Sequence, residues 1–337
     1  MTIDPLITRY LESDFFKSRL KIPTKANVSW DFLAQGEYNL NVVFLHPVTK
    51  KNYVLRMNFG SQMDLESQLR YEANALKLLA KTKRTPLLYL LDDSKKVIET
   101  DVLIMEYLPG EPLNYHTDIP LAMEILADIH SLKLPQNHGL VTPSSPVEAI
   151  LLECRKMFSH YETSSLAKPQ VVTRVKQMLN HLTKKSKSLS ITSTPYRCLI
   201  NTELNNTNFL INGAGKENYL IDWEKPIYAS PAQDLGHFFA PTTTFWKTDV
   251  FLSPKEINKN IDYYIARVDN RFPTSSLKEE INTYLEVTCL RGITWCAMAF
   301  VDYNSGEKKL TNESTRLKLG QYISQQFLDK IETSYLV

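Results

Sequence analysis

Two acidic residues and one amide stand at the borders of short apolar runs near the middle of the chain. The polar residues are Glu203, Asn208 and Asp222, and the apolar runs beside them cover residues 198–200, 209–211 and 219–221. Residues at the ends of neighbouring strands meet at one edge of a sheet, so we expect the three side chains to converge at the rim of one small sheet. Such a trio suits phosphoryl transfer, because one carboxylate can orient a hydroxyl group while amide and carboxylate oxygens hold Mg²⁺.

The same stretch resembles the catalytic loop and metal-binding strand of the aminoglycoside phosphotransferase and choline kinase family. That family carries His-x-Asp, an Asn five positions after this Asp, and a later Asp that opens an Asp-Trp-Glu or Asp-Phe-Gly unit. The matching residues here are Asn201-Thr202-Glu203, Asn208 and Asp222-Trp223-Glu224. The spacing agrees, but Asn201 stands in place of the His and Glu203 in place of the catalytic Asp.

The resemblance implies a role for each of these residues. Asn208 and Asp222 would hold Mg²⁺, ATP would be the phosphoryl donor, and Glu203 would orient the hydroxyl group of the acceptor. Glutamate keeps the carboxylate of the family's Asp on a side chain one methylene longer, so it can still accept a hydrogen bond from an attacking hydroxyl group.

Two functions of different classes stay open. The first is an ATP-dependent phosphotransferase that acts on a hydroxyl group of an aminoglycoside-, choline- or sugar-like small molecule. The alternative is a catalytically weak nucleotide-binding pseudokinase that serves as a regulatory or interaction module. The retained pair Asn208 and Asp222 favours the first.

Upstream of this stretch, apolar runs around a glycine-bearing turn predict a hairpin and a third strand. In the resembling family the turn at Gly36 covers the nucleotide phosphates, and Asn39 lies where the family often has Ser-Asn. Taken alone, Gly36 is an ordinary hairpin glycine. The resemblance further implies that Arg56, in the third strand, meets the phosphates of the nucleotide. Glu72, in an amphipathic helix expected over residues 63–81, would pair with this arginine.

We expect two more strands, around residues 97–98 and over 101–110. The second resembles the segment between the lobes of kinases, where the backbone groups of Glu106 to Leu108 would bond adenine. A strong helical pattern covers residues 120–132, and its His130 is interpreted as a packed side chain. In the family, the counterpart of Asp234 braces the catalytic loop through backbone hydrogen bonds.

The predicted fold class is therefore α+β, with the two lobes of a protein-kinase-like fold. Residues 1–108 would form the N-terminal lobe, a small antiparallel sheet with one helix that binds the nucleotide phosphates. Its first helix is expected over residues 7–20. Residues 109–337 would form a larger, mainly helical C-terminal lobe, with a loop expected over 184–195 before the stretch that carries Glu203. Late helices expected over 254–268, 276–303 and 315–332 would build the acceptor pocket of the family.

Composition limits the other classes of function. The chain has 337 residues, with 39 basic against 37 acidic side chains, so no strong overall field favours nucleic acid or an anionic membrane. No apolar run approaches the ~20 residues that cross a bilayer, and early acidic residues argue against a secretory signal. The four cysteines form no CxxC pair, which predicts reduced thiols in a cytoplasmic protein. No protein partner can be read from the sequence.

Overall fold

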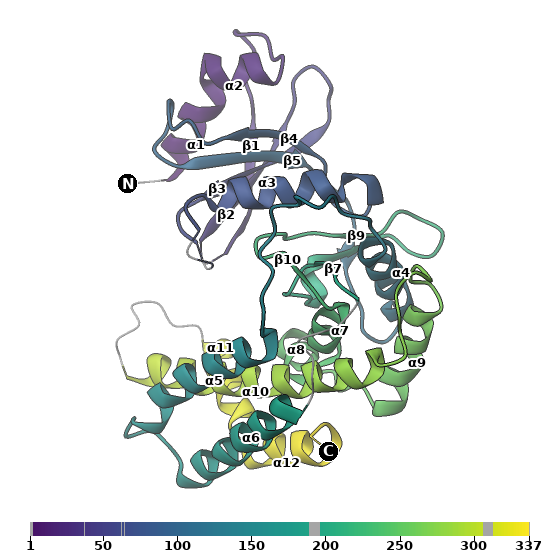
Figure 1. The fold of residues 1–337 in the computed structure, drawn as a ribbon. Helices are drawn as coiled ribbons and strands as arrows, with labels where there is room; N and C mark the ends of the chain where they lie inside the picture. Colours follow the sequence, from purple (N-terminus) through teal and green to yellow (C-terminus); the bar gives the residue numbers. More distant parts are fainter. Residues whose placement is uncertain are drawn as a thin grey trace. The chain divides into compact units, whose positions relative to one another are not determined.

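The computed structural model describes residues 3–36, 38–61, 63, 65–188, 196–305 and 313–336 (Figure 1). Packing divides the chain into two compact units. The first consists of Met1–Pro112, Leu134–Leu140 and Phe209–Pro226, and the second of Leu113–Lys133, Val141–Asn208 and Ile227–Val337. Each unit therefore combines segments that lie far apart in the sequence.

The first unit is built on a five-stranded antiparallel sheet with the strand order β1-β2-β3-β5-β4. Its strands are β1 (Trp30–Gln35), β2 (Asn39–Leu45), β3 (Asn52–Asn58), β4 (Leu88–Asp92) and β5 (Asp101–Glu106). Helix α3 (Gln68–Leu79) contacts β4 and β5, and the short 3-10 helix η1 (Ala80–Thr82) follows it. Because β3 lies in the middle of this sheet, five of its seven residues are buried.

Helices α1 (Ile3–Glu12) and α2 (Asp14–Arg19) share one apolar cluster with this sheet, in which Tyr10, Phe16 and Phe44 are all almost fully buried. The sequence predicts a single helix over residues 7–20, but the chain breaks at Ser13. The Ser13 hydroxyl group accepts a hydrogen bond from the Phe16 N–H at 3.2 Å, so it starts α2 as an N-cap.

The prediction of a strand around residues 97–98 is wrong. Its place beside β5 is taken by β4, which lies earlier in the chain. The Asp92 side chain accepts hydrogen bonds from the backbone and the hydroxyl group of Ser94, and Lys95 has a left-handed backbone with φ of 55°. These local bonds turn the chain after β4, so residues 97 and 98 pack as part of a connection.

A second, three-stranded sheet of the first unit has the order β6-β8-β9, with β6 (Glu111–Pro112), β8 (Phe209–Ile211) and β9 (Tyr219–Leu220). Gly110 precedes β6 with a φ of 148°, and a Cβ atom there would lie 2.8 Å from Leu210. Only glycine therefore fits this close approach of β6 to β8.

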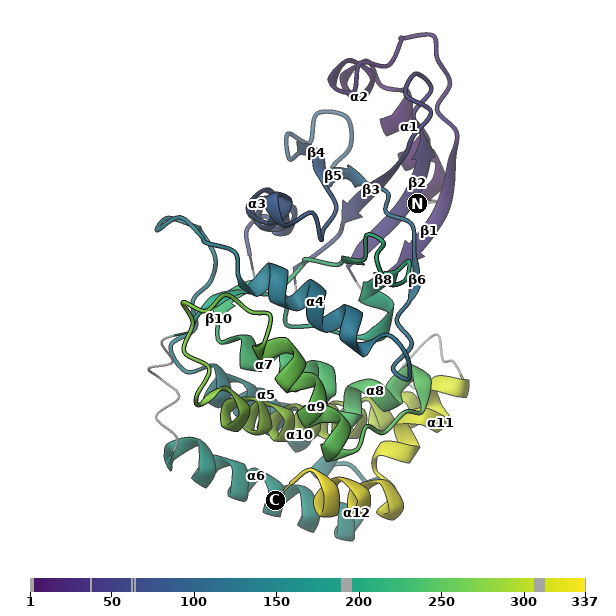
Figure 2. The same ribbon diagram turned by 90° about the vertical axis from the view of Figure 1, so that its right-hand side faces the viewer.

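The second unit is mainly helical, with the long helix α10 (Leu277–Asn304) at its centre (Figure 2). Around it lie α4 (Ile119–His130), α5 (Pro146–Glu162), α6 (Pro169–Ser188), α7 (Pro231–Phe239), α8 (Pro241–Thr248), α9 (Pro254–Ile265), α11 (Glu313–Tyr322) and α12 (Gln325–Ser334). Helix α10 contacts α5, α6, α7, α8 and α11. Together with the sheets of the first unit, these helices confirm the predicted α+β class.

Strand β7 (Cys198–Ile200) belongs to the second unit, where it pairs with β10 (Ile227–Ala229). The prediction that it would share one small sheet with β8 and β9 was wrong. The 3-10 helix η3 (Asn206–Asn208) lies directly before β8. It separates β7 from β8, and β8 then pairs with β6 and β9 instead.

Two helix boundaries also differ from the prediction. Residues 184–188, expected in a loop, belong to α6, and the remainder of that expected loop, 189–195, lies outside the described residues. The helix expected over 315–332 is divided into α11 and α12, because the Ser324 hydroxyl group caps α12 by accepting the Phe327 N–H at 3.2 Å.

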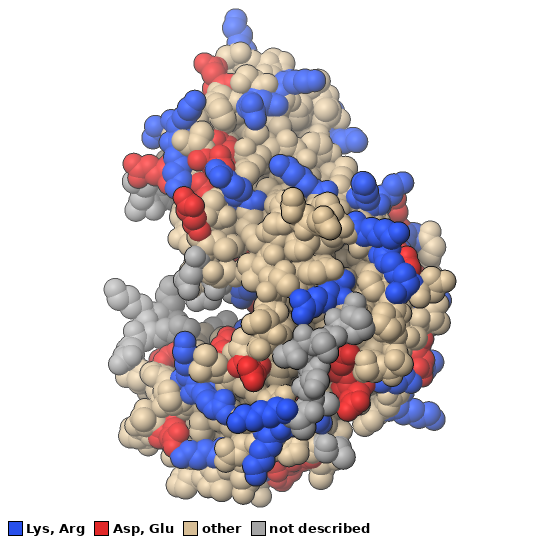
Figure 3. All heavy atoms as spheres, viewed as in Figure 1, with Lys and Arg blue, Asp and Glu red and all other residues tan. Residues whose placement is uncertain are grey.

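Helix α10 is long and apolar enough to cross a membrane by length and composition, although no continuous apolar run in the sequence predicts such a helix. Its most apolar window is 72% buried inside the protein, as expected for the core helix of a compact unit. Over the face drawn in Figure 3, basic and acidic side chains both occur, in keeping with their nearly equal numbers in the sequence.

The packing of α7 against α10 leads to a test of the fold. A Cβ atom at Gly236 would lie 2.6–2.8 Å from Tyr284 and Leu285 of α10, whereas at Gly320 of α11 the nearest atom is 3.9 Å away. We expect Gly236→Ala to lower the free energy of unfolding by about 1–3 kcal/mol through overpacking. Gly320→Ala should raise it by up to ~1 kcal/mol, because alanine favours helix. Urea unfolding followed by circular dichroism measures both, and equal effects of the two substitutions would contradict the predicted packing.

Candidate active site

A buried arginine lies at the centre of the polar side chains of the first unit. Arg56 is only 6% exposed, although it lies in an otherwise apolar strand. Strand β3 is paired on both sides, with Asn41 of β2 and Leu103 of β5 opposite Arg56. The Arg56 Nε donates a hydrogen bond to the Asn41 Oδ1 at 2.9 Å. A charge held this deeply must be compensated by partners, since burial of an unpaired ion is very costly.

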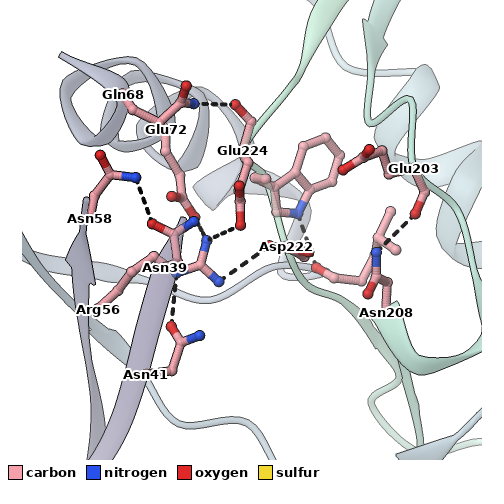
Figure 4. Close-up of polar contacts among 12 residues, drawn as sticks. Asn39, Asn41, Arg56, Asn58, Gln68, Glu72, Glu203, Asn208, Asp222 and Glu224 are labelled. Atoms are coloured by element: carbon pink, nitrogen blue, oxygen red, sulfur yellow. Dashed lines mark hydrogen bonds and ion pairs between the residues drawn. The ribbon is translucent and has the colours of Figure 1, made fainter. Parts of the chain in front are cut away.

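Three carboxylates supply that compensation (Figure 4). The Arg56 guanidinium lies 2.6 Å from Glu72, 3.2 Å from Asp222 and 3.7 Å from Glu224. The structure thus brings together Arg56, Glu72 and Asp222, which were predicted, and adds Glu224. Three acidic groups around one cation leave an excess of negative charge at this point.

Burial and this excess of negative charge shift the pKa values of Arg56 and of the glutamates around it. Burial acts to lower the pKa of Arg56, but the charges of Glu72, Asp222 and Glu224 outweigh it and raise that pKa above its usual value. Burial raises the pKa of Glu72. Burial and then the charge of Asp222 raise the pKa of Glu224 to about 7. A divalent cation next to Asp222 would neutralise this charge, so these residues fit the expected metal.

Helix α3 is fastened to the segment that carries Asp222. The Gln68 side chain donates a hydrogen bond to the Glu224 carbonyl at 2.6 Å, and the Tyr71 hydroxyl group donates to the Pro226 carbonyl at 2.5 Å. Glu72 lies on the same helix, one residue after Tyr71. The helix therefore fixes both the partner of Arg56 and the backbone beyond Asp222. Sequence periodicity showed the helix but gave no sign of these two bonds.

Asp222 itself has a left-handed backbone, with φ of 67°. The indole of the next residue, Trp223, is buried and donates a hydrogen bond to the Leu220 carbonyl at 3.0 Å. The Asp222 side chain is nevertheless 31% exposed, while that of Glu72 is 1% exposed. Of the carboxylates on Arg56, Asp222 is thus the one that solvent and ligands reach most easily.

The predicted phosphate-covering turn begins at Gly36, whose N–H donates to the Asn39 carbonyl at 2.8 Å. A Cβ atom at Gly36 would lie 3.8 Å from that carbonyl oxygen, so packing alone does not require glycine. The Asn39 side chain is buried and accepts a hydrogen bond from Asn58 at 2.7 Å. Among the described residues, the Asn39 amide nitrogen has no hydrogen-bond partner of normal geometry, yet it is close enough to Glu224 to act against the rise of the Glu224 pKa.

The two residues predicted to bond adenine differ in their backbone. The Glu106 N–H donates to the Leu87 carbonyl at 2.8 Å, and the Glu106 side chain accepts the Leu87 N–H at 3.2 Å. Within the described part of the chain, no hydrogen bond engages the backbone of Leu108, which is half-buried. Leu108 therefore retains backbone groups for a ligand, whereas the N–H of Glu106 is occupied.

In the second unit, Asp234 of α7 braces the loop that precedes Glu203. This fully buried carboxylate accepts the Asn201 N–H at 2.8 Å and the Thr202 N–H at 2.7 Å, which confirms the predicted bracing role. Thr202 has a φ of 76°, in a region that costs a residue with a side chain of the order of 1–3 kcal/mol. Two strong hydrogen bonds at this point hold the strained loop in place.

Glu203 is fixed at both of its backbone groups. Its N–H donates to the Asn201 Oδ1 at 3.0 Å, and its carbonyl accepts from the Asn208 Nδ2 at 2.8 Å. Asn201, which replaces the family's His, thus supports the loop with its own side chain. The hydrogen bond from the Asn208 Nδ2 to the Glu203 carbonyl orients the Asn208 side chain. The Asn208 Oδ1 atom is then left to serve as the predicted metal ligand. Asn208 belongs to the second unit and Asp222 to the first, so their convergence stays a prediction.

The sequence did not predict an arginine near Glu203 in the second unit. Arg291 of α10 binds Glu153 of α5 through two hydrogen bonds of 2.8 and 3.0 Å. Burial acts to lower the pKa of Arg291, but Glu153 and then Glu203 raise it. Arg291 lies among apolar residues of a core helix, and no spacing in the sequence connects it with the loop.

Among the residues that the structure describes, no three His, Cys, Asp or Glu side chains form a cluster of the kind that holds a metal by itself. A magnesium ion bound through one amide and one carboxylate needs no such cluster, since phosphate oxygens and water commonly complete its six ligands.

Comparison with known proteins places the chain among phosphotransferases. Residues 29–258 match the profile of the phosphotransferase enzyme family. No curated protein matches the sequence. The matched range contains all of the residues predicted for the site and covers more than half of the chain.

Solved structures of kinases share the fold. A putative aminoglycoside phosphotransferase from Ralstonia eutropha has a TM-score of 0.65 at 15% identity, over 97% of this chain and 98% of that one. An ethanolamine kinase from Plasmodium vivax has a TM-score of 0.61 at 15% identity, over 90% and 84%. Spectinomycin phosphotransferase, in complex with ADP and spectinomycin, has a TM-score of 0.60 at 15% identity, over 88% and 89%. These similarities confirm the predicted protein-kinase-like fold.

The raised pKa of Glu224 leads to a test of the charge balance around Arg56. With a pKa of about 7 in the folded chain and an ordinary value near 4.5 when unfolded, Glu224 binds a proton on folding between these pH values. Stability should therefore fall as the pH rises through this window. Glu224→Gln removes this titrating group. We therefore expect the free energy of unfolding of this variant to exceed that of the wild type at pH 8 by up to ~3 kcal/mol and to depend less on pH.

Urea unfolding at pH 5 and pH 8, in the presence of EDTA, measures this difference. Glu99→Gln, at an exposed acidic residue of the same unit, serves as the control and should behave as the wild type does. An equal pH dependence in the wild type and Glu224→Gln would contradict the assigned charge balance.

Proposed function

Because this chain belongs to the phosphotransferase enzyme family, we propose that it transfers the γ-phosphoryl group of Mg·ATP to a hydroxyl group of a small molecule. The observation that carries this proposal is the buried Arg56, held by Glu72 at 2.6 Å and by Asp222 at 3.2 Å. A cation fixed by a helix glutamate is the arrangement with which kinase-like enzymes bind nucleotide phosphates.

The proposed donor site uses residues of the first unit. Arg56 would contact the phosphates, and Glu72 would keep its guanidinium in place. The turn at Gly36 and Asn39 would cover the phosphates, and the backbone at Glu106 and Leu108 would bond adenine. ATP as the donor is supported by the ADP in the structure of spectinomycin phosphotransferase, a protein of similar fold.

The proposed metal ligands are the Asn208 Oδ1 and the Asp222 carboxylate. The register of the β8–β9 hairpin supports this pairing. Leu220, two residues before Asp222, pairs with Phe209, the residue directly after Asn208. When bound, Mg²⁺ would neutralise charge on the phosphates, and the excess of carboxylates around Arg56 suits a divalent cation.

The proposed reaction is an in-line displacement. Glu203 accepts a hydrogen bond from the acceptor hydroxyl group and receives its proton as the new bond from oxygen to the γ-phosphorus forms. The bond from the γ-phosphorus to the oxygen that bridges it to the β-phosphate breaks, and ADP leaves. The fixed backbone of Glu203 supports this role, because a carboxylate must be well positioned to orient an attacking group.

The acceptor that we propose is an aminoglycoside-, choline- or sugar-like molecule. Ethanolamine, aminoglycosides and spectinomycin, which appear in the names of proteins of similar fold, are small molecules of this kind. We further propose residues 1–108 and 109–337 as the functional lobes. A cytoplasmic location, where ATP is available, suits four cysteines that are all free thiols.

Calorimetry and an assay of ADP formation test the proposal. We expect wild type to bind ATP only with Mg²⁺, and Asp222→Ala to lose this metal-dependent binding because a proposed ligand is removed. Glu203→Gln should keep the affinity for Mg·ATP and lose at least tenfold in turnover with ethanolamine, choline or spectinomycin as the probe. The exposed Glu148 offers a matched control, Glu148→Gln, which should leave binding and turnover unchanged.

The outcomes separate the two functions. Binding of Mg·ATP with no turnover on any probe, and no phosphate release into water, would favour the nucleotide-binding pseudokinase. Absence of nucleotide binding at millimolar ATP would overturn both.

A further inference from the structure

A chain of four hydrogen-bonded, buried polar side chains leads from Tyr196, before β7, to Asp234, which holds the loop that carries Glu203. The Tyr196 hydroxyl group lies 3.1 Å from that of Tyr264, which lies 2.9 Å from the Nδ1 of His130. The Nε2 of His130 lies 3.3 Å from the Oδ2 of Asp234. All four residues are at most 1% exposed. They come from α4, α7, α9 and the segment before β7, so the chain connects elements that are separate in the sequence.

The direction of the hydrogen bonds follows from the chemistry of each group. The Asp234 carboxylate can only accept, so the Nε2 of His130 carries the hydrogen of this contact. In the neutral imidazole, Nδ1 is then the acceptor, and the Tyr264 hydroxyl group donates to it. Tyr264 in turn accepts from Tyr196. In this tautomer each group therefore has a defined donor or acceptor role, and the series ends at the carboxylate.

The carboxylate at the end of this series holds the strained part of the loop. Asp234 accepts the N–H groups of Asn201 and Thr202, and the Asn201 side chain accepts the N–H of Glu203. A left-handed Thr202 persists only where its surroundings fix it. The rotation of the Asp234 carboxyl group is therefore a point at which the position of Glu203 can be controlled.

We propose that Tyr264 is a positioning residue for Glu203. Its hydroxyl group fixes the ring of His130, His130 fixes the carboxylate of Asp234, and Asp234 fixes the loop. The catalytic consequence rests on the function proposed above, whereas the effect on the loop does not. No pattern in the sequence indicates this role, because Tyr264 lies 61 positions after Glu203 in an ordinary amphipathic helix.

Other buried tyrosines show that packing alone does not create such a chain. The hydroxyl group of Tyr284, on α10, is buried without a hydrogen-bond partner in the described part of the structure. Tyr264 and Tyr284 are both almost fully buried, but only the hydroxyl group of Tyr264 belongs to the series of hydrogen bonds that ends at Asp234. Tyr284→Phe is therefore a matched control for Tyr264→Phe.

Hydrogen exchange at the loop amides tests the proposal directly. In Tyr264→Phe, His130 loses its donor, so we expect the amides of Asn201 and Thr202 to exchange about tenfold faster than in wild type. Exchange in the middle of α5 and α10 should not change. Tyr284→Phe should leave the amides of Asn201 and Thr202 at the wild-type rate. Unchanged exchange at these two amides in Tyr264→Phe, or equal acceleration throughout the second unit, would overturn the proposal.

Turnover provides a second measurement that tests the role of Tyr264. With Mg·ATP and water as the probe reaction, Tyr264→Phe should lower kcat by about tenfold and leave KM for Mg·ATP unchanged, since the donor site is untouched. If Tyr264→Phe does not fold, Tyr196→Phe removes the donor to Tyr264, and faster exchange confined to the loop is expected again. A wild type without turnover would contradict the proposed function alone, because the exchange measurement requires no activity.

Discussion

The buried charge of Arg56 is the constraint on which the first unit depends. A guanidinium group that is 6% exposed requires compensating carboxylates, and these come from α3 and from the segment after β9. To bring them there, α3 must lie against the sheet, and the chain must return from residue 209 to residue 226 to complete the unit. The bonds from Gln68 and Tyr71 to that segment then make the arrangement rigid. The electrostatic need of one side chain thus accounts for much of the architecture.

The second unit solves a different problem, which is how to hold a strained loop. The strained backbone of this loop is stabilised by hydrogen bonds to buried side chains. Asp234 accepts N–H groups of the loop, and Asp234 is in turn linked to His130 and to buried tyrosine hydroxyl groups. Asn201 takes part through its own side chain, so the residue that departs from the family's His contributes to the support. The replacement of Asp by Glu at position 203 therefore occurs in a loop whose backbone is held at several points.

Periodicity located the strand that carries Arg56 and the helix that carries Glu72, because it is a local signal. Sequence reasoning obtained the fold class, the family and the pairing of these two residues from the resemblance to the family's motifs. It also found Asp234 through the family's motif. It placed a strand at 97–98 because apolar composition alone cannot show that Asp92 and Lys95 turn the chain. It missed Glu224 as a partner of Arg56, and it missed Tyr264, because each contact depends on distant segments packing together. Such contacts have no periodicity and become visible only in three dimensions.

The cysteines have a practical consequence for studying the two units. Cys154, Cys198, Cys289 and Cys296 are all buried free thiols, and burial raises the pKa of each. Since the thiolate is the reactive form, alkylating dyes and spin labels will modify these native positions slowly. The four natural cysteines should therefore contribute little labelling of their own when a new cysteine is introduced on the surface. One cysteine introduced on the surface of each unit could carry a donor and acceptor dye pair, and energy transfer between the dyes would report how the units move in solution when nucleotide is added.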